Sequence, residues 1–144
     1  MKREYPKRPI PGVGVVVFNG EKILLIKRNK EPKAAEWSIP GGAQDLGETL
    51  TECAMREVNE ETGIKIENIT LLKAVDYIDK DENNDIRFHY SLIDYMADYK
   101  SGDLVAGDDV LDAKWVHIND FKSYNLWQET IDLIEDAIVH RRSK

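Results

Sequence analysis

Two runs of apolar, mostly β-branched residues lie on either side of an Asn-Gly pair near the start of the chain. The first is "VGVVVF" from Val13 to Phe18, the second is "KILLIKR" from Lys22, and Asn19-Gly20 lies between them. Asn-Gly adopts the left-handed backbone that a two-residue hairpin turn requires, and β-branched residues are typical of strands. This stretch therefore predicts a β-hairpin.

A helix is predicted over residues 50–62, after a short extended piece with the sequence "WSIPGG". Thr49 and Glu52 have the spacing of a capping box, in which each side chain accepts a hydrogen bond from the backbone of the other residue. Gly63 fits the left-handed position that ends many helices.

The rest of the chain predicts further strands and one more helix. Residues 69–77, residues 86–92 and the segment from Ala113 have the composition or the alternation of strands, and residues 79–85 indicate an exposed turn. In the second of these strands, one face is predicted to be buried; it consists of Ile86, Phe88, Tyr90 and Leu92.

Helical spacing returns near the end of the chain, at Trp127, Ile131, Ile134 and Ile138. Strands outnumber helices, and most of the strands lie between the two helices in the sequence. The predicted fold class is α/β, an α/β/α sandwich with a mixed β-sheet between helices.

Composition restricts the class of protein. A chain of 144 residues has the size of a single domain, and its net charge of −7 argues against a nucleic-acid polymer as partner. The longest apolar run, Val15–Phe18, is far too short to cross a membrane, and residues 1–11 lack the apolar segment of a secretory signal. We expect one domain over residues 1–144, with 1–11 flexible or extended, acting in the cytoplasm without a membrane partner.

The predicted helix 50–62 carries acidic side chains in an unusual direction. At about 100° per residue, Glu57 and Glu61 each lie about 20° from the direction of Leu50, on the side that is apolar in the first half of the helix. Inward carboxylates are unfavourable unless they are paired or bind a cation. Spacing alone leaves two interpretations open, a Mg²⁺ site that shares its ion with substrate phosphates or a salt-bridge cluster with Arg56.

The segment "GGAQDLGETLTECAMREVNEETGI", residues 41–64, resembles the signature box of the Nudix hydrolases at every position that the signature specifies. The flanking sequences "KR", "WSIPGG" and "GDDVLDAKWV" are also similar to this family, so that the resemblance covers residues 12–121. It implies hydrolysis of a nucleoside diphosphate linked to another group, an α/β/α sandwich around a mixed sheet, and Mg²⁺ as cofactor, with Mn²⁺ as a substitute.

The resemblance also implies roles for single residues. Glu57 and Glu61 correspond to the principal metal ligands, Glu60 to a third ligand, and the carbonyl of Gly42 to a further one, whereas Glu48 and Arg56 correspond to a pair that orients the helix. Either Glu57 or an acid of the later loop, Asp108 or Asp109, is expected to be the general base. The expected substrate-binding residues are Arg28, which can grip a phosphate with its fork of N–H groups, and Gly41 with Gly42, which let the backbone approach it.

The sequence constrains the identity of the substrate less than it constrains the reaction. The flanks resemble the short ADP-ribose pyrophosphatase-like branch, although no proline follows Pro40, where larger ADP-ribose enzymes have one after the box. Trp37, Phe88 and Tyr90 could stack on a base or belong to the core. We expect a small nucleotide as partner, ADP-ribose first, with a nucleoside triphosphate pyrophosphohydrolase or a nucleotide-sensing domain as alternatives, and a homodimer is possible in this family.

Overall fold

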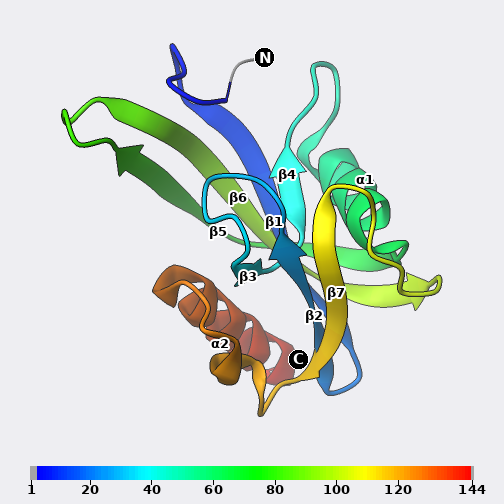
Figure 1. Cartoon of the computed structure of the whole chain (residues 1–144). Coiled ribbons are helices and arrows are strands. Elements are labelled where there is room, and N and C mark those ends of the chain that lie inside the picture. The colour runs from blue at the N-terminus through cyan, green and yellow to red at the C-terminus, as the bar shows by residue number, and fades with distance from the viewer. Residues whose placement is uncertain (1–2, 144) are drawn as a thin grey trace.

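The computed structural model describes residues 3–143, which form a mixed β-sheet between two helices (Figure 1). The elements in chain order are β1 (Ile10–Asn19), β2 (Lys22–Arg28), β3 (Trp37–Ser38), β4 (Gly41–Ala43), α1 (Leu50–Thr62), β5 (Lys65–Lys80), β6 (Ile86–Ser101), β7 (Val110–His117), the 3-10 helix η1 (Phe121–Tyr124) and α2 (Gln128–Arg142). The strand order is β3-β2-β1-β6-β5, with β4 paired to β1 and β7 paired to β2. Since β1 and β6 run parallel and the other pairs antiparallel, the predicted mixed sheet is confirmed.

Alternation along the central strands sends apolar side chains into two separate cores, one on each face of the sheet. Val15 and Val17 of β1 pack with Ala54 and Val58 of α1 in the first core. The second core, against α2, contains Val16, Phe18, Ile23, Leu25, Leu133, Ile134 and Ala137. The predicted helix on each face is therefore confirmed (Figure 1).

The ends of α1 are fixed as the sequence indicates. The Thr49 hydroxyl accepts a hydrogen bond from the Glu52 N–H, and the Glu52 carboxylate accepts one from the Thr49 N–H, which completes the capping box. Gly63 ends the helix with φ 75°, in the left-handed region. These two local signals hold the helix in one register, and with it the direction of every acidic side chain on it.

The hairpin β1–β2 opens soon after its turn. Its paired residues are Phe18 with Ile23 and Asn19 with Lys22. Beyond them β4 pairs with the first half of β1 and β3 with the end of β2, while β7 pairs along the other edge of β2. The sheet therefore divides into two parts that diverge from the turn, which is formed by Gly20 and Glu21 and not by the expected Asn19-Gly20 pair. Residues on both sides of this division, together with the end of α1 and the start of α2, line a cavity of about 580 Å³.

Several sequence-based boundaries need correction. The strand expected at 69–77 extends over Lys65–Lys80, and the next extends over Ile86–Ser101, because the two form one long antiparallel pair. The exposed turn is accordingly shorter than residues 79–85, and β1 already begins at Ile10, within the N-terminal segment 1–11, whose residues 1–2 lie outside the described residues.

The prediction that one face of residues 86–92 is buried is only partly confirmed. Phe88 is buried, but Ile86 is 44% exposed beside the turn that joins β5 to β6. Tyr90 and Leu92 are half-buried because they line the cavity. Within residues 3–143, no helix is both long and apolar enough to cross a membrane.

The Gly63 end of α1 yields a stability prediction. An added Cβ at Gly63 would lie 2.7 Å from the Asp103 carbonyl oxygen, whereas one at Gly47, whose φ is 84°, would meet no atom within 4 Å. Both positions strain a side chain through positive φ, and Gly63 adds a collision with backbone. We expect Gly47→Ala to lower the free energy of unfolding by about 1 kcal/mol and Gly63→Ala by about 2 kcal/mol or more, measured by urea denaturation. Equal losses would contradict this reading of the helix end.

Candidate active site

The acidic side chains of α1 fall into two groups by exposure. The Glu57 side chain is 14% exposed and lies against β4, where a Cβ at Gly42 would overlap its carboxylate. The Glu61 carboxylate accepts a hydrogen bond of 2.8 Å from the Gly41 N–H. Glu60 is 57% exposed. Glu57 and Glu61 thus face the cavity as the sequence predicts, and Glu60 lines its rim.

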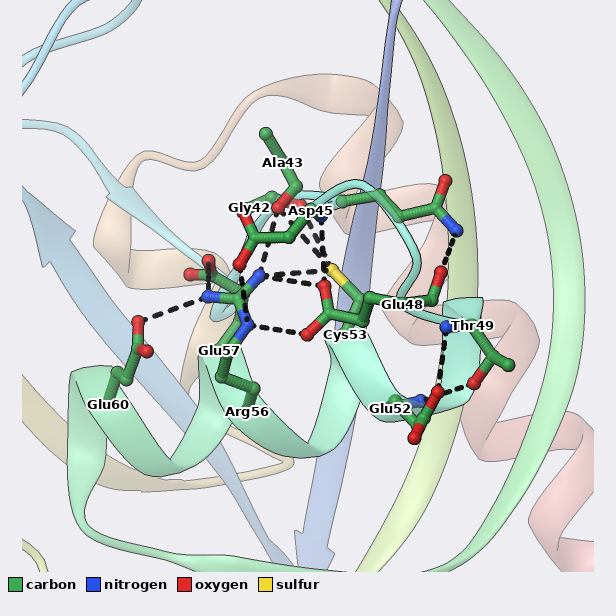
Figure 2. Close-up of polar contacts among 11 residues, drawn as sticks. Gly42, Ala43, Asp45, Glu48, Thr49, Glu52, Cys53, Arg56, Glu57 and Glu60 are labelled. Atoms are coloured by element: carbon green, nitrogen blue, oxygen red, sulfur yellow. Dashed lines mark hydrogen bonds and ion pairs between the residues drawn. The ribbon is translucent and has the colours of Figure 1, made fainter.

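Arg56 connects these acids to the loop that precedes the helix (Figure 2). Its Nε lies 2.6 Å and its Nη2 3.0 Å from the two carboxylate oxygens of Glu48. Its Nη1 donates to Glu57 at 2.7 Å and to Glu60 at 3.2 Å. The expected pair of Glu48 and Arg56 is present as a bidentate contact, and the same guanidinium also neutralises part of the acidic cluster.

Burial makes the two inward carboxylates difficult to ionise. It raises the pKa of Glu61 to about 8, an effect that the Gly41 N–H opposes and the charge of Glu57 reinforces. It also raises the pKa of Glu57, although hydrogen bonding to Arg56 lowers it. Both groups therefore lie where an added positive charge would stabilise the carboxylate form.

The donor chemistry of this cluster fits a hard divalent cation. Glu57 and Glu61 offer carboxylate oxygens, and Mg²⁺ needs only one or two of these, with water and substrate phosphates as its other ligands. No three acidic, cysteine or histidine side chains in the described part of the chain lie close enough together to hold one ion by themselves. The site therefore suits an ion that shares its ligands with a substrate.

Arg28 lies in the same cavity, at the end of β2. Its Nε donates to the Pro32 carbonyl at 2.8 Å, which leaves both Nη groups without a hydrogen bond to any residue in 3–143. Its charge lowers the pKa of Glu61, so the two side chains are near one another. Asp109 also lines the cavity and pairs with Lys30 at 3.5 Å, but its side chain is 72% exposed.

The lining of the cavity also contains residues that sequence reasoning missed. Tyr77 and Trp127 meet edge to face at 5.3 Å, and the Lys33 ammonium lies over both rings. Asp94 of β6 lines the same space and is only 6% exposed. Its sequence signal was available: the alternation from Phe88 through Tyr90 and Leu92 continues to Asp94, which places one acid on an otherwise apolar face.

The three aromatic residues suggested from the sequence have different surroundings. Phe88 is 3% exposed. Trp37 packs beside the second core and meets Tyr124 edge to face at 5.2 Å, although it also borders the cavity. Tyr90 lines the cavity and is half-buried.

The bond between Glu48 and Arg56 generates a pH prediction. Hydrogen bonds from Arg56 lower the pKa of Glu48 from 4.5 to about 2, so its ionised form stabilises the fold above about pH 4.5, and this contribution is lost as the pH falls toward 2. Glu48→Gln should lower the melting temperature by a few degrees at neutral pH, and the difference from the unmodified chain should shrink in acid. Asp45→Asn is the matched control, because Asp45 contacts Arg56 at 3.4 Å but is 70% exposed. A Glu48→Gln deficit that stays constant across this range would contradict the assignment.

Comparison with known proteins adds to this geometry. The model of the NUDIX domain matches residues 8–137. The chain is 34% identical over 111 residues to an ADP-ribose pyrophosphatase of Methanocaldococcus jannaschii, which covers 77% of this chain and 63% of that protein. It is 28% identical over 141 residues to the NAD-capped RNA hydrolase NudC of Pseudomonas putida, over 97% of this chain and 48% of that protein. The chain thus spans about half to two thirds of the length of these relatives.

Solved structures have the same fold. A MutT NUDIX hydrolase from Burkholderia pseudomallei superposes with a TM-score of 0.78 and 32% identity, covering 90% of this chain and 98% of that one. The NUDIX domain of Shewanella oneidensis NrtR, complexed with ADP ribose, superposes with a TM-score of 0.77 and 25% identity, covering 96% and 90%. With the family model matched along most of its length, this chain belongs to the NUDIX family.

Proposed function

We propose that this protein is a divalent-cation-dependent hydrolase that cleaves the pyrophosphate bond of ADP-ribose to give AMP and ribose 5-phosphate. One observation carries the proposal: the half-buried carboxylates of Glu57 and Glu61 and the free guanidinium fork of Arg28 line one cavity of about 580 Å³. This volume lies within the range of pockets for small-molecule ligands.

The residues that would hold the cation are Glu57 and Glu61, with the Gly42 carbonyl and Glu60 as further ligands. A bound Mg²⁺ or Mn²⁺ would supply the positive charge that both the buried carboxylates and a pyrophosphate require. Gly41 positions Glu61 through its N–H, and Arg56 positions Glu57 through its Nη1. Each acid is thus held by a contact that leaves part of its carboxylate accessible to the cavity.

Other residues bind the substrate and move the proton. The Nη groups of Arg28 are placed to bind phosphate oxygens in a bidentate manner. Glu57 is our proposed general base, because it is half-buried, its pKa is raised, and Arg56 fixes its orientation. Asp109 is the alternative base; it lies at the exposed edge of the cavity, where Lys30 partly neutralises it.

Two observations favour ADP-ribose as the substrate. A relative named as an ADP-ribose pyrophosphatase and a structure complexed with ADP ribose are both similar to this chain. In addition, Asp108 and Asp109 border the cavity, where carboxylates can accept hydrogen bonds from ribose hydroxyls but would repel the added charge of a third phosphate.

The proposed cation site predicts a response to metal and to mutation. A chelator should abolish hydrolysis, and Mg²⁺ or Mn²⁺ should restore it. Glu57→Gln, which removes a negative charge and the proposed base, should lower kcat/KM by at least roughly 100-fold, and Mg²⁺ should raise the melting temperature of Glu57→Gln and Glu61→Gln less than that of the unmodified chain.

Glu67→Gln is the control, because Glu67 is an exposed residue of β5 outside the cavity. Turnover that survives both the chelator and Glu57→Gln would exclude this site. Asp109→Asn should have the smaller effect on kcat if Glu57 is the base, and the reverse order would assign that role to Asp109.

The proposed substrate predicts a product pattern. Steady-state assays with ADP-ribose, other ADP-sugars and nucleoside triphosphates should give the highest kcat/KM for ADP-ribose, with AMP and ribose 5-phosphate as products. Release of AMP and of pyrophosphate should be followed separately. A triphosphate with a kcat/KM tenfold higher would identify a triphosphate pyrophosphohydrolase, and ADP-ribose binding without turnover of any substrate would identify a sensor.

A further inference from the structure

Two buried polar side chains of this protein have no partner in the fold. Asp94 is 6% and Thr130 8% exposed, and neither side chain forms a hydrogen bond or an ion pair with any residue in 3–143. Thr62, the third buried polar residue, differs from them: its hydroxyl donates to the Val58 carbonyl at 2.6 Å and accepts from the Ile64 N–H at 3.3 Å. Burial of a polar group without a hydrogen bond is unfavourable, so Asp94 and Thr130 need a partner from outside this part of the chain.

Both residues line the cavity that contains the proposed cation site. Asp94 reaches it from β6 and Thr130 from the start of α2. Among the described residues, no fully enclosed side-chain nitrogen or oxygen lacks a hydrogen-bond partner. The unpaired oxygens of Asp94 and Thr130 are therefore not fully enclosed, and the cavity is the space that both residues line.

The position of Asp94 in the sheet places it within reach of a ligand at the cation site. Gly14 of β1 pairs with Asp94, and its missing side chain leaves room for the carboxyl, because a Cβ at Gly14 would lie 2.6 Å from the Asp94 Oδ1. On its other edge Gly14 pairs with Gly41, whose N–H binds Glu61. Two strand spacings, about 10 Å, thus separate Asp94 from Gly41, a distance that one nucleotide can span.

The surroundings of Asp94 favour an uncharged partner. Burial raises the pKa of Asp94 to about 7; Lys73 lowers it and Glu129 raises it. The Lys73 ammonium binds Asp136 at 3.0 Å and so does not pair with the carboxyl. In either protonation state the carboxyl keeps an oxygen that accepts a hydrogen bond, and the threonine hydroxyl both donates and accepts. A ligand group that satisfies them therefore needs a donor and no negative charge.

We propose that Asp94 and Thr130 form a polar subsite that binds an uncharged, hydrogen-bond-donating group of the ligand, a sugar hydroxyl or an amine of the base, while the phosphates lie at the cation site. The inference rests on the proposed function and adds two binding residues to it. A carboxyl and a hydroxyl pair with donors and acceptors alike, so the subsite fixes the position of the ligand and does not select one base.

Stability measurements separate this binding role from a structural one. Thr130→Val removes the hydroxyl but keeps the shape of the side chain, so it should leave the melting temperature unchanged or raise it. Thr62→Val is the matched control and should lower the melting temperature by a few degrees, because its hydroxyl is bonded within the fold. Asp94→Asn, measured at pH 8, should not lower it either, since it removes a buried charge. A loss in Thr130→Val as large as that in Thr62→Val would overturn the proposal.

Kinetics of the same variants measure the contact with the ligand. Thr130→Val should raise KM for ADP-ribose about threefold and Asp94→Leu about tenfold. In both, kcat should change little, because a contact remote from the reacting bond contributes equally to substrate and transition state. Asp94→Asn keeps one acceptor oxygen and should raise KM less than Asp94→Leu. Asp98→Asn is the control and should keep the original KM, because Asp98 is on the same strand, pairs with Arg141 and does not line this cavity.

The two products identify which half of the ligand carries the donor. AMP and ribose 5-phosphate are tested as inhibitors with Mg²⁺ present, and the inhibition constant of the product that contacts the subsite should rise in Asp94→Leu. ADP-ribose hydrolysis with KM and both inhibition constants unchanged in Asp94→Leu would overturn the subsite and leave the proposed function intact. If the unmodified chain does not hydrolyse ADP-ribose, but calorimetry shows AMP binding that weakens in Asp94→Leu, the subsite is retained and the proposed substrate is rejected.

Discussion

The candidate active site depends on a single cation, the guanidinium of Arg56. It binds both oxygens of Glu48 and the Ala43 carbonyl on the loop side, and Glu57 and Glu60 on the helix side (Figure 2). Four carboxylates, those of Asp45, Glu48, Glu57 and Glu60, surround this half-buried guanidinium. Each is attracted to Arg56 and repelled by the others. Their spacing is therefore fixed by a shared partner and not by the helix alone.

This arrangement explains how an acidic helix can be stable without basic residues in its last turn. α1 has an acid in its first turn and no base in its last, and its C-terminal half contains Glu57, Glu60 and Glu61. Arg56 offsets the repulsion for two of these acids. Glu61 has no contact with Arg56 in the described residues; it accepts one hydrogen bond from Gly41, and burial raises its pKa to about 8.

The sequence allowed the elements to be predicted where a signal is local. The Asn-Gly hairpin signal, the Thr49–Glu52 cap and the Gly63 end each depend on residues within a few positions of one another. The structure confirms the hairpin, the cap and the helix end, but the two-residue turn is Gly20-Glu21, because Asn19 pairs with Lys22. The lengths of β5 and β6 were underestimated because the strands support one another across the long β5–β6 pair, through contacts between residues far apart in the chain. The alternation of apolar and polar residues does not indicate where the pairing of two strands ends.

The distinction between local and long-range signals also explains which residues of the candidate site were predicted and which were missed. The box carboxylates were found because their spacing on one helix determines their direction. Asp94 was missed because its significance comes from Gly14 on β1, Lys73 on β5 and the start of α2, which only the fold brings together. An isolated acid in a strand is ordinarily exposed. The alternation that places Asp94 on the same face as Phe88 does not by itself show that its carboxyl is buried.

The two ends of the cavity place different requirements on a ligand. At one end, Glu57 and Glu61 are accompanied by the free fork of Arg28, so a group bound there must carry negative charge and bring or share cations. Asp94, in another part of the lining, is 6% exposed beside Gly14 and Ile39, and burial raises its pKa to about 7. A group bound against it must therefore hydrogen-bond to a carboxyl that is unfavourable when charged. A phosphate bound against Asp94 would meet a buried acid, and an uncharged base bound beside α1 would leave the Nη groups of Arg28 without a hydrogen bond among residues 3–143. This difference in charge favours a ligand whose negatively charged groups lie toward α1 and away from Asp94.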